Sequence, residues 1–168
     1  MSEDPRFCPV CGARLIEVEH REQPRLRCPA CQRIHYRNPA VGVAVVVMEG
    51  DRLLLGRRSR GPYAGRWCIP CGYVEWDEDI HDAARREFHE ETGLLIEVGA
   101  VCAVHSNFHD RARQTVGVWF WGTIHGGRLA AGDDLDAVEF FALDALPPLA
   151  FPTDALVIDG LRQSQSSP

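Results

Sequence analysis

The fold of this chain is decided by an acidic segment, residues 72–94, which reads GYVEWDEDIHDAARREFHEETGL. Treating residues 79–91 as a helix and stepping about 100° per residue places one stripe of side chains at the spacing of a core-facing helix. Two glutamates, Glu87 and Glu91, therefore occupy positions that this pattern reserves for apolar residues. The stripe consists of Ile80, Ala83, Ala84, Glu87, Phe88 and Glu91.

The inward glutamates need a charged partner. Burying an unpaired carboxylate costs several kcal/mol, so buried carboxylates are normally paired or bound to a metal. Glu87, Glu90 and Glu91 lie within about 100° of arc on the expected helix, so their oxygens can converge on one point. A solvated face is the ordinary interpretation of a charge-rich helix, but it does not place carboxylates on the core side. Carboxylate oxygens suit Mg²⁺ or Mn²⁺, and the absence of sulfur and histidine from that face argues against zinc there.

The acidic segment resembles the Nudix box. Gly72 is followed after five residues by Glu78, and after seven more by residues 86–94, REFHEETGL, so each defining position of the box is filled. Many members of the Nudix family have a second glycine directly before the first, whereas this chain has Cys71 there. The resemblance implies hydrolysis of a nucleoside diphosphate linked to another moiety, with the box helix holding divalent metal ions.

The resemblance also implies roles for individual residues of the box. The glutamates of its second half are expected to be ligands of Mg²⁺ or Mn²⁺, with the backbone carbonyl of Gly72 as a further ligand. Arg86 is expected to orient these carboxylates through ion pairs, and Glu78, nearly opposite Glu87 on the helical wheel, is expected to brace the box. The expected catalytic residues are thus Glu87, Glu90, Glu91 and Arg86.

Residues before and after the box can contact a substrate. Arg57 and Arg58 end a predicted strand that leads toward the box, and an arginine fork suits a phosphate group. Only one of the two faces the site if the strand alternates. Some aromatic residues can stack on a base, although aromatics at such positions are more often part of a core. These aromatic candidates are Tyr36, Trp119, Trp121 and Phe151.

The identity of the general base stays open between the box and a loop outside it. Glu91 can polarise a metal-bound water, and Nudix enzymes also recruit an acid from a loop beyond the box. Glu139 is the best placed of these acids because it lies next to a predicted strand, and a surface position is the alternative for it. Glu139 is also, with Arg57 and Arg58, a candidate for substrate contact. The acids outside the box are Asp133, Asp134, Asp136 and Glu139.

Four cysteines near the N-terminus have the spacing of a zinc site. Cys8-Pro-Val-Cys11 and Cys28-Pro-Ala-Cys31 are two CxxC pairs with 16 residues between them. At this spacing two short turns can bring four thiolates around one tetrahedral Zn²⁺, and disulfides are the weaker alternative in a reducing compartment. About 35 residues cannot build a sufficient core without a metal, so the expected role of Zn²⁺ is structural. The module resembles the zinc ribbon that precedes the catalytic domain in one Nudix subgroup.

Composition and charge limit the functional classes. The chain has 168 residues, 45% hydrophobic and 25% charged, enough for one ordinary domain and a small module. No apolar run approaches about 20 residues and the N-terminus lacks the apolar core of a signal peptide, so we expect a cytoplasmic protein without a membrane partner. The formal net charge is −6, and the acidic segment, with eight acids and two arginines, also carries −6. An acidic focus on a neutral body favours a cation site over a polyanion-binding surface.

The remaining pattern predicts a mixed sheet between helices. A β-branched run at residues 40–48 is typical of a strand buried on both faces, and Gly93 suits a helix C-cap. An α/β fold of this kind agrees with the Nudix α/β/α sandwich. We expect the zinc ribbon at residues 1–37, a Nudix hydrolase domain at 38–163 and a frayed tail at 164–168. Further strands are expected at residues 52–58, 94–104, 115–125 and 138–142, and helices at 144–146 and 153–163.

The flanks of the box narrow the expected substrate. Residues 34–39 (IHYRNP) and 140–147 (FFALDALP) resemble the corresponding parts of ribbon-bearing ADP-ribose and FAD pyrophosphatases, which release AMP. NADH pyrophosphatases also carry the ribbon, but their Ser-Gln-Pro-Trp-Pro-Phe-Pro segment has no counterpart in residues 95–130. Hydrolysis of NADH or of NAD-capped RNA, with the ribbon aiding nucleic-acid or partner binding, is therefore the alternative.

A small nucleotide is the expected partner of this chain. Residues 1–40 hold seven arginines against five acids, too small an excess for a convincing basic patch, so nucleic acid is not expected to bind. A catalytically idle nucleotide sensor is a third hypothesis, and the complete glutamate set argues against it. The third CxxC pair, Cys68 and Cys71, is not expected to hold a second metal because four other cysteines already complete one site. Enzymes of this subgroup are often dimers, which makes a homodimer possible here.

Overall fold

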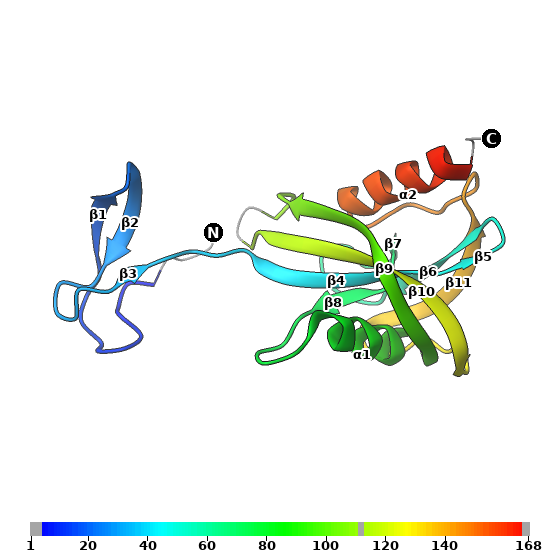
Figure 1. Cartoon of the computed structure of the whole chain (residues 1–168), viewed down its shortest axis with the longest axis horizontal. Coiled ribbons are helices and arrows are strands. Elements are labelled where there is room, and N and C mark those ends of the chain that lie inside the picture. Colours follow the sequence, from blue (N-terminus) through cyan, green and yellow to red (C-terminus); the bar gives the residue numbers. More distant parts are fainter. Residues whose placement is uncertain (1–4, 111–112, 166–168) are drawn as a thin grey trace. The chain divides into compact units, whose positions relative to one another are not determined.

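A boundary at Pro39 divides the chain into two units (Figure 1). The structure is a computed structural model that describes residues 5–110 and 113–165. The unit before the boundary, which we call the cysteine unit, also includes Arg113. The unit that begins at Ala40 is called the main unit, and it contains the acidic segment.

The cysteine unit is a small antiparallel sheet beside two cysteine turns. Strands β1 (Ile16–His20) and β2 (Gln23–Arg27) form a hairpin, and the short β3 (Ile34–His35) pairs with β2. The hairpin turn holds Arg21 and Glu22 at φ of 52° and 62°. Two-residue hairpins favour mirror-image turns in which both central residues have positive φ, because the twist of such turns matches that of the strands. The buried core of this unit consists of Cys8, Leu15 and Cys28.

Two sheets form the middle of the main unit. Their strands are β4 (Ala40–Val46), β5 (Met48–Glu49), β6 (Arg52–Arg58), β7 (Trp67–Cys68), β8 (Cys71–Tyr73), β9 (Leu94–Asn107), β10 (Thr115–Gly127) and β11 (Leu135–Ala142). The larger sheet has the order β8-β4-β10-β9, with β10 parallel to β4 and antiparallel to β9, which confirms the predicted mixed sheet. The smaller sheet has the order β11-β6-β5, and β7 also pairs with β6.

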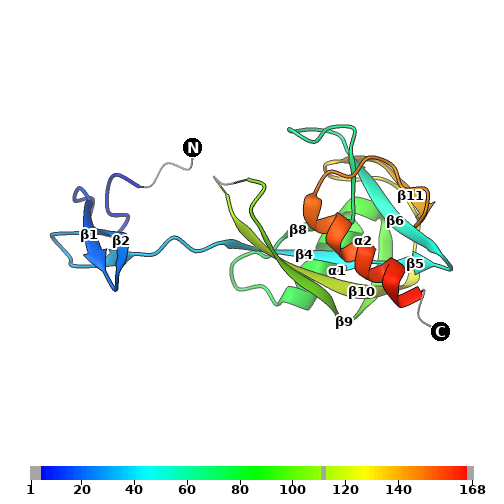
Figure 2. The same cartoon turned by 90° about the horizontal axis from the view of Figure 1, so that it is seen from above.

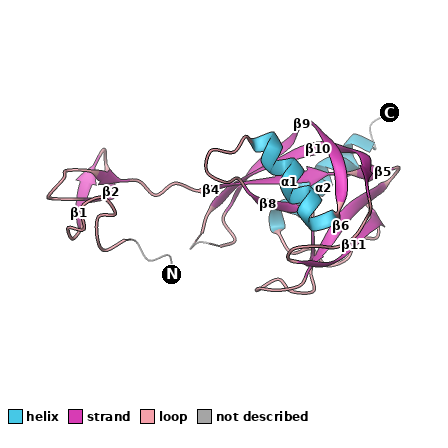
Figure 3. Ribbon diagram, turned by 90° about the horizontal axis from the view of Figure 1, so that it is seen from below, coloured by secondary structure: helices cyan, strands magenta, loops and turns pink. Residues whose placement is uncertain are grey.

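Two helices, α1 (Ile80–Thr92) and α2 (Pro152–Gln165), cover the sheets from opposite sides (Figures 1, 2 and 3). Consecutive residues of β4 and of β6 enter different cores, which is why these strands read as continuous apolar runs. Burying one such side chain fully contributes about 1.5–3 kcal/mol. The core at α1 contains Val43, Val45, Leu54, Ala83, Ala84, Phe88 and Phe120. The core at α2 contains Val46, Leu53, Leu55, Trp119, Val157, Ile158 and Leu161.

Both ends of helix α1 are capped. The side chain of Asp79 accepts a hydrogen bond from the backbone N–H of His81 at 2.8 Å, as an N-cap does. Gly93 ends the helix at φ 69°, a left-handed conformation that glycine adopts without a steric cost, and its N–H donates to the carbonyl of His89 at 2.8 Å. The helix predicted at residues 79–91 is therefore confirmed to within one residue at each end.

The helix predicted at residues 144–146 is wrong. These residues belong to a turn in which the N–H of Ala145 donates to the carbonyl of Ala142 at 3.0 Å. The cause is the pair Pro147 and Pro148. Proline donates no backbone hydrogen bond, and it disfavours the helical conformation in the residue before it.

Four elements of the main unit extend beyond their predicted bounds, and β11 begins three residues before the strand predicted at residues 138–142. The strand predicted at residues 40–48 is divided, because β4 ends at Val46 and β5 begins at Met48. Helix α2 runs to Gln165, so residues 164–165 of the predicted frayed tail are helical, and residues 166–168 lie outside the described residues. Strands β9 and β10 are also longer than predicted because they pair with each other over most of their length, which overrides weak local propensity. No helix within residues 5–110 and 113–165 is long and apolar enough to cross a membrane.

Candidate active site

Of the three glutamates on helix α1, Glu91 is buried and Glu87 is largely buried, in keeping with their core-side positions in the helical pattern. Glu91 is 2% exposed, and the side chain of Glu87 is 14% exposed. The side chain of Glu90 is 49% exposed, in keeping with its place at the border of the apolar stripe. Carboxylates buried to this degree require hydrogen-bonding or charged partners.

Arg86 joins four groups of the acidic segment. Its Nε and Nη2 donate to the two carboxylate oxygens of Glu78 at 2.7 and 2.8 Å, a bidentate geometry. Its Nη1 donates to Glu87 at 2.8 Å and to Glu90 at 3.2 Å, and its Nη2 also donates to the carbonyl of Tyr73 at 3.1 Å. The hydrogen bonds from Arg86 lower the pKa of Glu78 to about 2. Arg86 thus contacts the carboxylates of Glu78, Glu87 and Glu90 at once, as a residue that orients them must.

The buried carboxylate of Glu91 accepts a backbone hydrogen bond from the strand before the helix. The N–H of Cys71 donates to Glu91 Oε2 at 2.8 Å. Burial raises the pKa of Glu91 well above its usual value, and the neighbouring Cys71, Asp134 and Glu87 raise it further. Burial also raises the pKa of Glu87, although Arg86 opposes this effect. Two neighbouring carboxylates whose charged forms are disfavoured make a place that a bound cation stabilises.

Gly72 leaves the space that the carboxylate of Glu87 fills. A Cβ atom at Gly72 would lie 1.9 Å from Glu87 Cδ, so the carboxylate would have to move to make room for it. The strand that carries Gly72 is fixed by its pairing with Val43 of β4, so the backbone cannot easily retreat. This cradle lets the Glu87 carboxylate lie directly against the backbone of Gly72. Cys71, where many Nudix boxes have glycine, does not have a positive φ, so its side chain introduces no strain at the turn.

A loop after β10 holds the C-terminal end of α1. The N–H groups of Ala130 and Gly132 donate to the carbonyls of Thr92 and Glu91 at 2.9 and 3.0 Å. These bonds satisfy carbonyl groups at the helix end that have no partner within the helix. A Cβ atom at Gly132 would lie 2.3 Å from the carbonyl oxygen of Glu90, so the loop passes directly over the helix backbone.

The same loop brings Asp133 and Asp134 to the box. The charge of Asp133 raises the pKa of Glu87, and the charge of Asp134 raises the pKa of Glu91. Arg58 Nη2 pairs with Asp134 Oδ2 at 2.7 Å, and the two side chains are only 19% and 17% exposed. Two of the acids singled out beyond the box, and one of the two arginines, therefore lie beside the glutamates.

Arg57 and Glu139 lie on the other face of the smaller sheet. Glu139 is paired with Leu55 in the β6–β11 ladder, and Arg57 follows Leu55 on the same face of β6. Leu55 belongs to the core at α2, on the side away from α1. Arg57 pairs with the exposed Asp136 at 2.6 Å. The alternation of the strand therefore directs Arg58 toward the box and Arg57 away from it.

Arg58 contacts one ring of a small aromatic group. Its guanidinium carbon lies 5.5 Å from the centre of the Phe151 ring. The rings of Tyr63 and His109 lie 5.4 and 5.5 Å from that of Phe151. The sequence pattern does not single out Tyr63 and His109, because their loops meet only in the folded chain. The other aromatic candidates are Trp119 in the core at α2, the partly exposed Trp121 on β10, and Tyr36 in the cysteine unit.

A buried aspartate that the sequence does not mark fixes the chain before the box. Asp154, in the first turn of α2, is 2% exposed. It accepts hydrogen bonds from the N–H of Ile69 at 3.1 Å and from Trp119 Nε1 at 3.3 Å. Ile69 precedes Cys71 by two residues, so Asp154 helps to position the strand that contacts Glu91. Its two partners lie 85 and 35 positions away along the chain, which is why no local motif reveals it.

Replacing Asp154 by asparagine is expected to flatten the pH dependence of unfolding. Burial raises the pKa of Asp154 from 3.8 to about 7. A carboxyl group of this kind contributes to stability while it is protonated, and the contribution is lost as the pH rises from about 4 to about 7. The wild type should lose up to about 1.4 kcal/mol of unfolding free energy per pH unit through this group, and Asp154→Asn should not.

Urea unfolding followed by tryptophan fluorescence measures this difference, because all four tryptophans lie in the main unit. The matched control is Asp159→Asn, which changes an exposed aspartate of the same helix and should keep the wild-type slope. An Asp154→Asn protein with the wild-type slope would show that Asp154 does not titrate in this range.

The helical wheel allows the carboxylates of Glu87, Glu90 and Glu91 to converge on one point. In the structure their oxygens do not all lie close together. Within residues 5–110 and 113–165, one group of His, Cys, Asp or Glu has ligand atoms that all lie within 4.8 Å of one another, and it is the four cysteines. Arg86 Nη1 lies between Glu87 and Glu90, where its charge offsets their repulsion. A cation held by both glutamates would take over this role from Arg86.

The four cysteines of the cysteine unit form a compact cluster. Cys8 Sγ lies 3.7 Å from Cys31 Sγ, and Cys11 Sγ lies 3.4 Å from Cys28 Sγ. Hydrogen bonding from the backbone N–H of Val10 lowers the pKa of Cys8 to about 7, and bonding from that of Cys31 lowers the pKa of Cys28 to about 6. The thiolate, which is the form that binds a metal, is thus favoured at Cys8 and Cys28, whereas the neighbouring thiol of Cys28 and burial raise the pKa of Cys11 to about 12. The donor set suits a tetrahedral metal ion.

Models of known protein families match both units of the chain. A model described as NUDIX domain matches residues 37–160, and a model described as Nudix N-terminal, a zinc ribbon, matches residues 6–37. A crystal structure of a Nudix hydrolase from Nitrosomonas europaea is similar to this chain, with a TM-score of 0.84 and 28% identity over 98% of this chain and 95% of that one.

Two curated relatives have named activities. An ADP-ribose pyrophosphatase of Methanocaldococcus jannaschii is 36% identical over 128 residues, 76% of each chain. The NAD-capped RNA hydrolase NudC of Pseudomonas aeruginosa is 29% identical over 144 residues, 86% of this chain but 50% of that protein, so this chain spans about half the length of the NudC relative. The chain belongs to the Nudix family, as a hydrolase of phosphorus-containing anhydrides that carries the N-terminal zinc ribbon of that family.

Proposed function

We propose that this chain hydrolyses the pyrophosphate bond of ADP-ribose or FAD and releases AMP. The observation that carries the proposal is the box itself, in which Arg86 binds Glu78, Glu87 and Glu90 while Glu91 is buried beside them. The choice of ADP-ribose is supported by the relative named ADP-ribose pyrophosphatase, which this chain matches over 76% of both lengths.

The catalytic metal would be Mg²⁺ or Mn²⁺, held by the carboxylates of Glu87, Glu90 and Glu91 and by the carbonyl of Gly72. When bound, such an ion polarises a phosphoryl oxygen and makes a water molecule more nucleophilic. The fit rests on the cradle at Gly72 and on the two carboxylates whose burial disfavours their charged forms. Oxygen donors of this type are the ones these ions prefer.

The protein's own groups orient the reactants. Arg86 holds Glu87 and Glu90 in place through its Nη1, and its bidentate pair with Glu78 fixes the guanidinium. Arg58 is the substrate-binding arginine in this proposal, because its partner Asp134 lies beside Glu91, whereas Arg57 and Glu139 lie on the other face of the sheet. An arginine held at such a place can bind a phosphate oxygen of the substrate.

Glu91 is our candidate for the general base. Its carboxylate is the most buried of the box, and burial raises its pKa, which makes it a better proton acceptor than an ion-paired carboxylate. Asp134 is less suited to this role because Arg58 occupies one of its oxygens at 2.7 Å. Glu91 would accept the proton of the attacking water while the phosphoanhydride bond breaks, leaving AMP and ribose 5-phosphate from ADP-ribose.

The metal of the cysteine unit would be Zn²⁺, held by Cys8, Cys11, Cys28 and Cys31. Its role in this proposal is structural. The buried core of the unit contains one leucine besides two of the cysteines, which is too little to hold its sheet together without a metal.

Replacing Gly72 by alanine is expected to lower kcat by about 100-fold, because a displacement of about 1 Å in a catalytic group can have that effect. The new methyl group would overlap the carboxylate of Glu87 and force it out of its place. The measurement is the steady-state rate of AMP release from ADP-ribose with Mg²⁺. Gly160→Ala is the matched control, since a Cβ there meets nothing within 4 Å. A Gly72→Ala protein with wild-type kcat would show that the cradle does not matter.

The proposed function is tested by a product assay over ADP-ribose, FAD, NADH and NAD-capped RNA, each with Mg²⁺ and with Mn²⁺. We expect AMP from ADP-ribose at the highest kcat/KM. A preference for NADH or NAD-capped RNA would support the second candidate function, which the NudC relative suggests through its match to both units of this chain. The absence of pyrophosphate cleavage on every substrate would overturn both.

A further inference from the structure

The sheet of the cysteine unit sorts its charged side chains onto two faces. Residues that are opposite each other in an antiparallel ladder point to the same face, and neighbours along a strand point to opposite faces. The ladder pairs Ile16 with Arg27, Val18 with Arg25, and His20 with Gln23 on one face. We call this side the arginine face and define it by Ile16, Val18, His20, Arg25, Arg27 and Tyr36.

Tyr36 is the aromatic centre of the arginine face. It is 56% exposed, an unusual position for a ring of this size. The guanidinium carbon of Arg25 lies 5.4 Å from the ring centre, and the Tyr36 hydroxyl lies 3.5 Å from His20 Nε2. These contacts fix the orientation of the ring, so one ring face is presented together with a positive charge.

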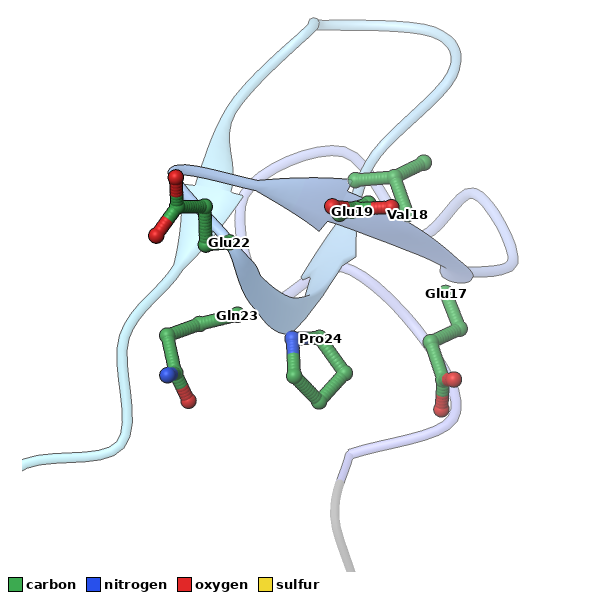
Figure 4. Close-up of a pocket in the computed structure, with 6 residues that line it drawn as sticks. All are labelled: Glu17, Val18, Glu19, Glu22, Gln23 and Pro24. Carbon is green, nitrogen blue, oxygen red and sulfur yellow. The ribbon is translucent and has the colours of Figure 1, made fainter.

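The arginines of this face have no acidic partner among the residues that the structure describes. Neither Arg25 nor Arg27 forms an ion pair with any residue that the structure describes, and Arg27 Nε is buried without a hydrogen-bond partner. The carboxylates of the hairpin line a hollow of about 310 Å³ near the turn, which also includes Val18 of the arginine face (Figure 4). Its lining consists of Glu17, Val18, Glu19, Glu22, Gln23 and Pro24.

The cysteine unit carries a small positive formal charge and the main unit carries a negative one. Residues 1–39 hold seven arginines and five acids, whereas the rest of the chain holds eleven arginines and nineteen acids. A polyanion is therefore repelled by the main unit and attracted by one face of the cysteine unit. A count of charges along the sequence does not separate the two faces of the hairpin, because Glu17 and Glu19 alternate with residues of the arginine face.

We propose that the arginine face binds single-stranded nucleic acid. One base stacks on Tyr36, and Arg25 and Arg27 bind phosphate oxygens on either side of it. A single strand fits better than a duplex, because only unpaired bases expose a face that can stack on a protruding ring. Binding at the arginine face does not require hydrolysis of the nucleic acid. It can therefore be tested independently of the proposed ADP-ribose or FAD substrate.

The test is fluorescence anisotropy of a labelled single-stranded RNA of about 12 nucleotides without a 5′ diphosphate, titrated with the full chain in its zinc form. Tyr36→Ala should weaken binding by about tenfold, and Tyr36→Phe, which keeps the ring, should bind like the wild type. Arg25→Ala with Arg27→Ala should lower the slope of log Kd against log salt by about 1.4, as expected when two phosphate contacts are lost.

The charge-matched control is Arg52→Ala with Arg85→Ala, which removes two exposed arginines of the main unit. It should leave RNA binding unchanged, and zinc content should stay at about one per chain in every variant, as a check on folding. Equal affinity for DNA of the same sequence supports contacts to bases and phosphates alone, and tighter RNA binding adds a contact to the 2′-hydroxyl.

Three results would overturn the proposal. The first is an equal loss of binding in the control pair, which would mean a general charge effect. The second is wild-type affinity in Tyr36→Ala. The third is competition by polyglutamate as strong as that by unlabelled RNA, which would make the face a general polyanion surface.

Discussion

Glu91→Gln is expected to lower turnover by at least about 100-fold, on the scale of losing one group that stabilises developing charge. Glutamine keeps the shape of the side chain and an oxygen that can accept the hydrogen bond from the N–H of Cys71. It loses the negative charge that a divalent cation and a general base both require. Burial raises the pKa of Glu91 in the folded chain, so the charged form is disfavoured there and its removal should not lower stability at neutral pH.

Activity and stability should therefore separate in this variant. The measurements are kcat for AMP release and the free energy of unfolding in urea. Glu90→Gln should show the same loss of activity, whereas Glu97→Gln, an exposed glutamate on β9, should behave like the wild type. Near wild-type, Mg²⁺-dependent turnover in both Glu90→Gln and Glu91→Gln would contradict the assignment of the box glutamates.

Cys28→Ser is expected to abolish zinc binding and to unfold the cysteine unit. Cys28 is fully buried at the centre of the cluster, and its Sγ lies 3.4 Å from that of Cys11. Structural Zn²⁺ contributes about 10–16 kcal/mol of apparent binding free energy in small domains, far more than the core of this unit can replace. Zinc per chain, measured by mass spectrometry of the metal, should fall from about one to near zero.

Two comparisons separate this effect from general damage. Cys102→Ser changes a partly buried cysteine of β9 outside the cluster and should retain its zinc. Tryptophan fluorescence reports only the main unit, and it should show the wild-type unfolding transition in Cys28→Ser. A folded Cys28→Ser protein with one zinc per chain would count against a four-cysteine site.

Much of the fold follows from local signals in the sequence. The apolar stripe and the C-cap residue Gly93 predict helix α1, and the β-branched run after Pro39 predicts a strand buried on both faces. These elements could be predicted because propensity, periodicity and capping agree over one short stretch. The same agreement is absent at residues 144–146, where a following proline pair outweighs local helix propensity.

The candidate site is only partly local. The box residues are close in sequence, so a helical wheel predicts the core-side position of Glu87 and Glu91, of which Glu91 is fully buried. Asp154, Tyr63 and His109 could not be predicted, because each reaches its partners through strands and loops that are distant in sequence. Strand parity did predict that only one of two adjacent arginines faces the box, but not which of them.

The charge pattern of the cysteine unit also could not be predicted from residues that are close in sequence. A count over residues 1–40 gives a small excess of arginine, and on that basis nucleic acid is not an expected partner. Pairing of β1 with β2 separates Arg25 and Arg27 from Glu17 and Glu19, so a weak average becomes two faces of opposite charge. The register of a hairpin depends on its turn, and Arg21 and Glu22 are not residues from which a mirror-image turn would be predicted.

Mn²⁺ binding to the wild type and to Glu90→Gln, with free Mn²⁺ measured by electron paramagnetic resonance, shows whether the acidic segment is a site for a divalent metal ion. This measurement needs neither a substrate nor turnover, so it asks only whether the box glutamates hold a divalent ion. We expect saturable binding to the wild type and to Glu97→Gln, and binding at least about tenfold weaker in Glu90→Gln. Equal Mn²⁺ affinity in all three proteins would contradict the assignment of the box as the catalytic metal site.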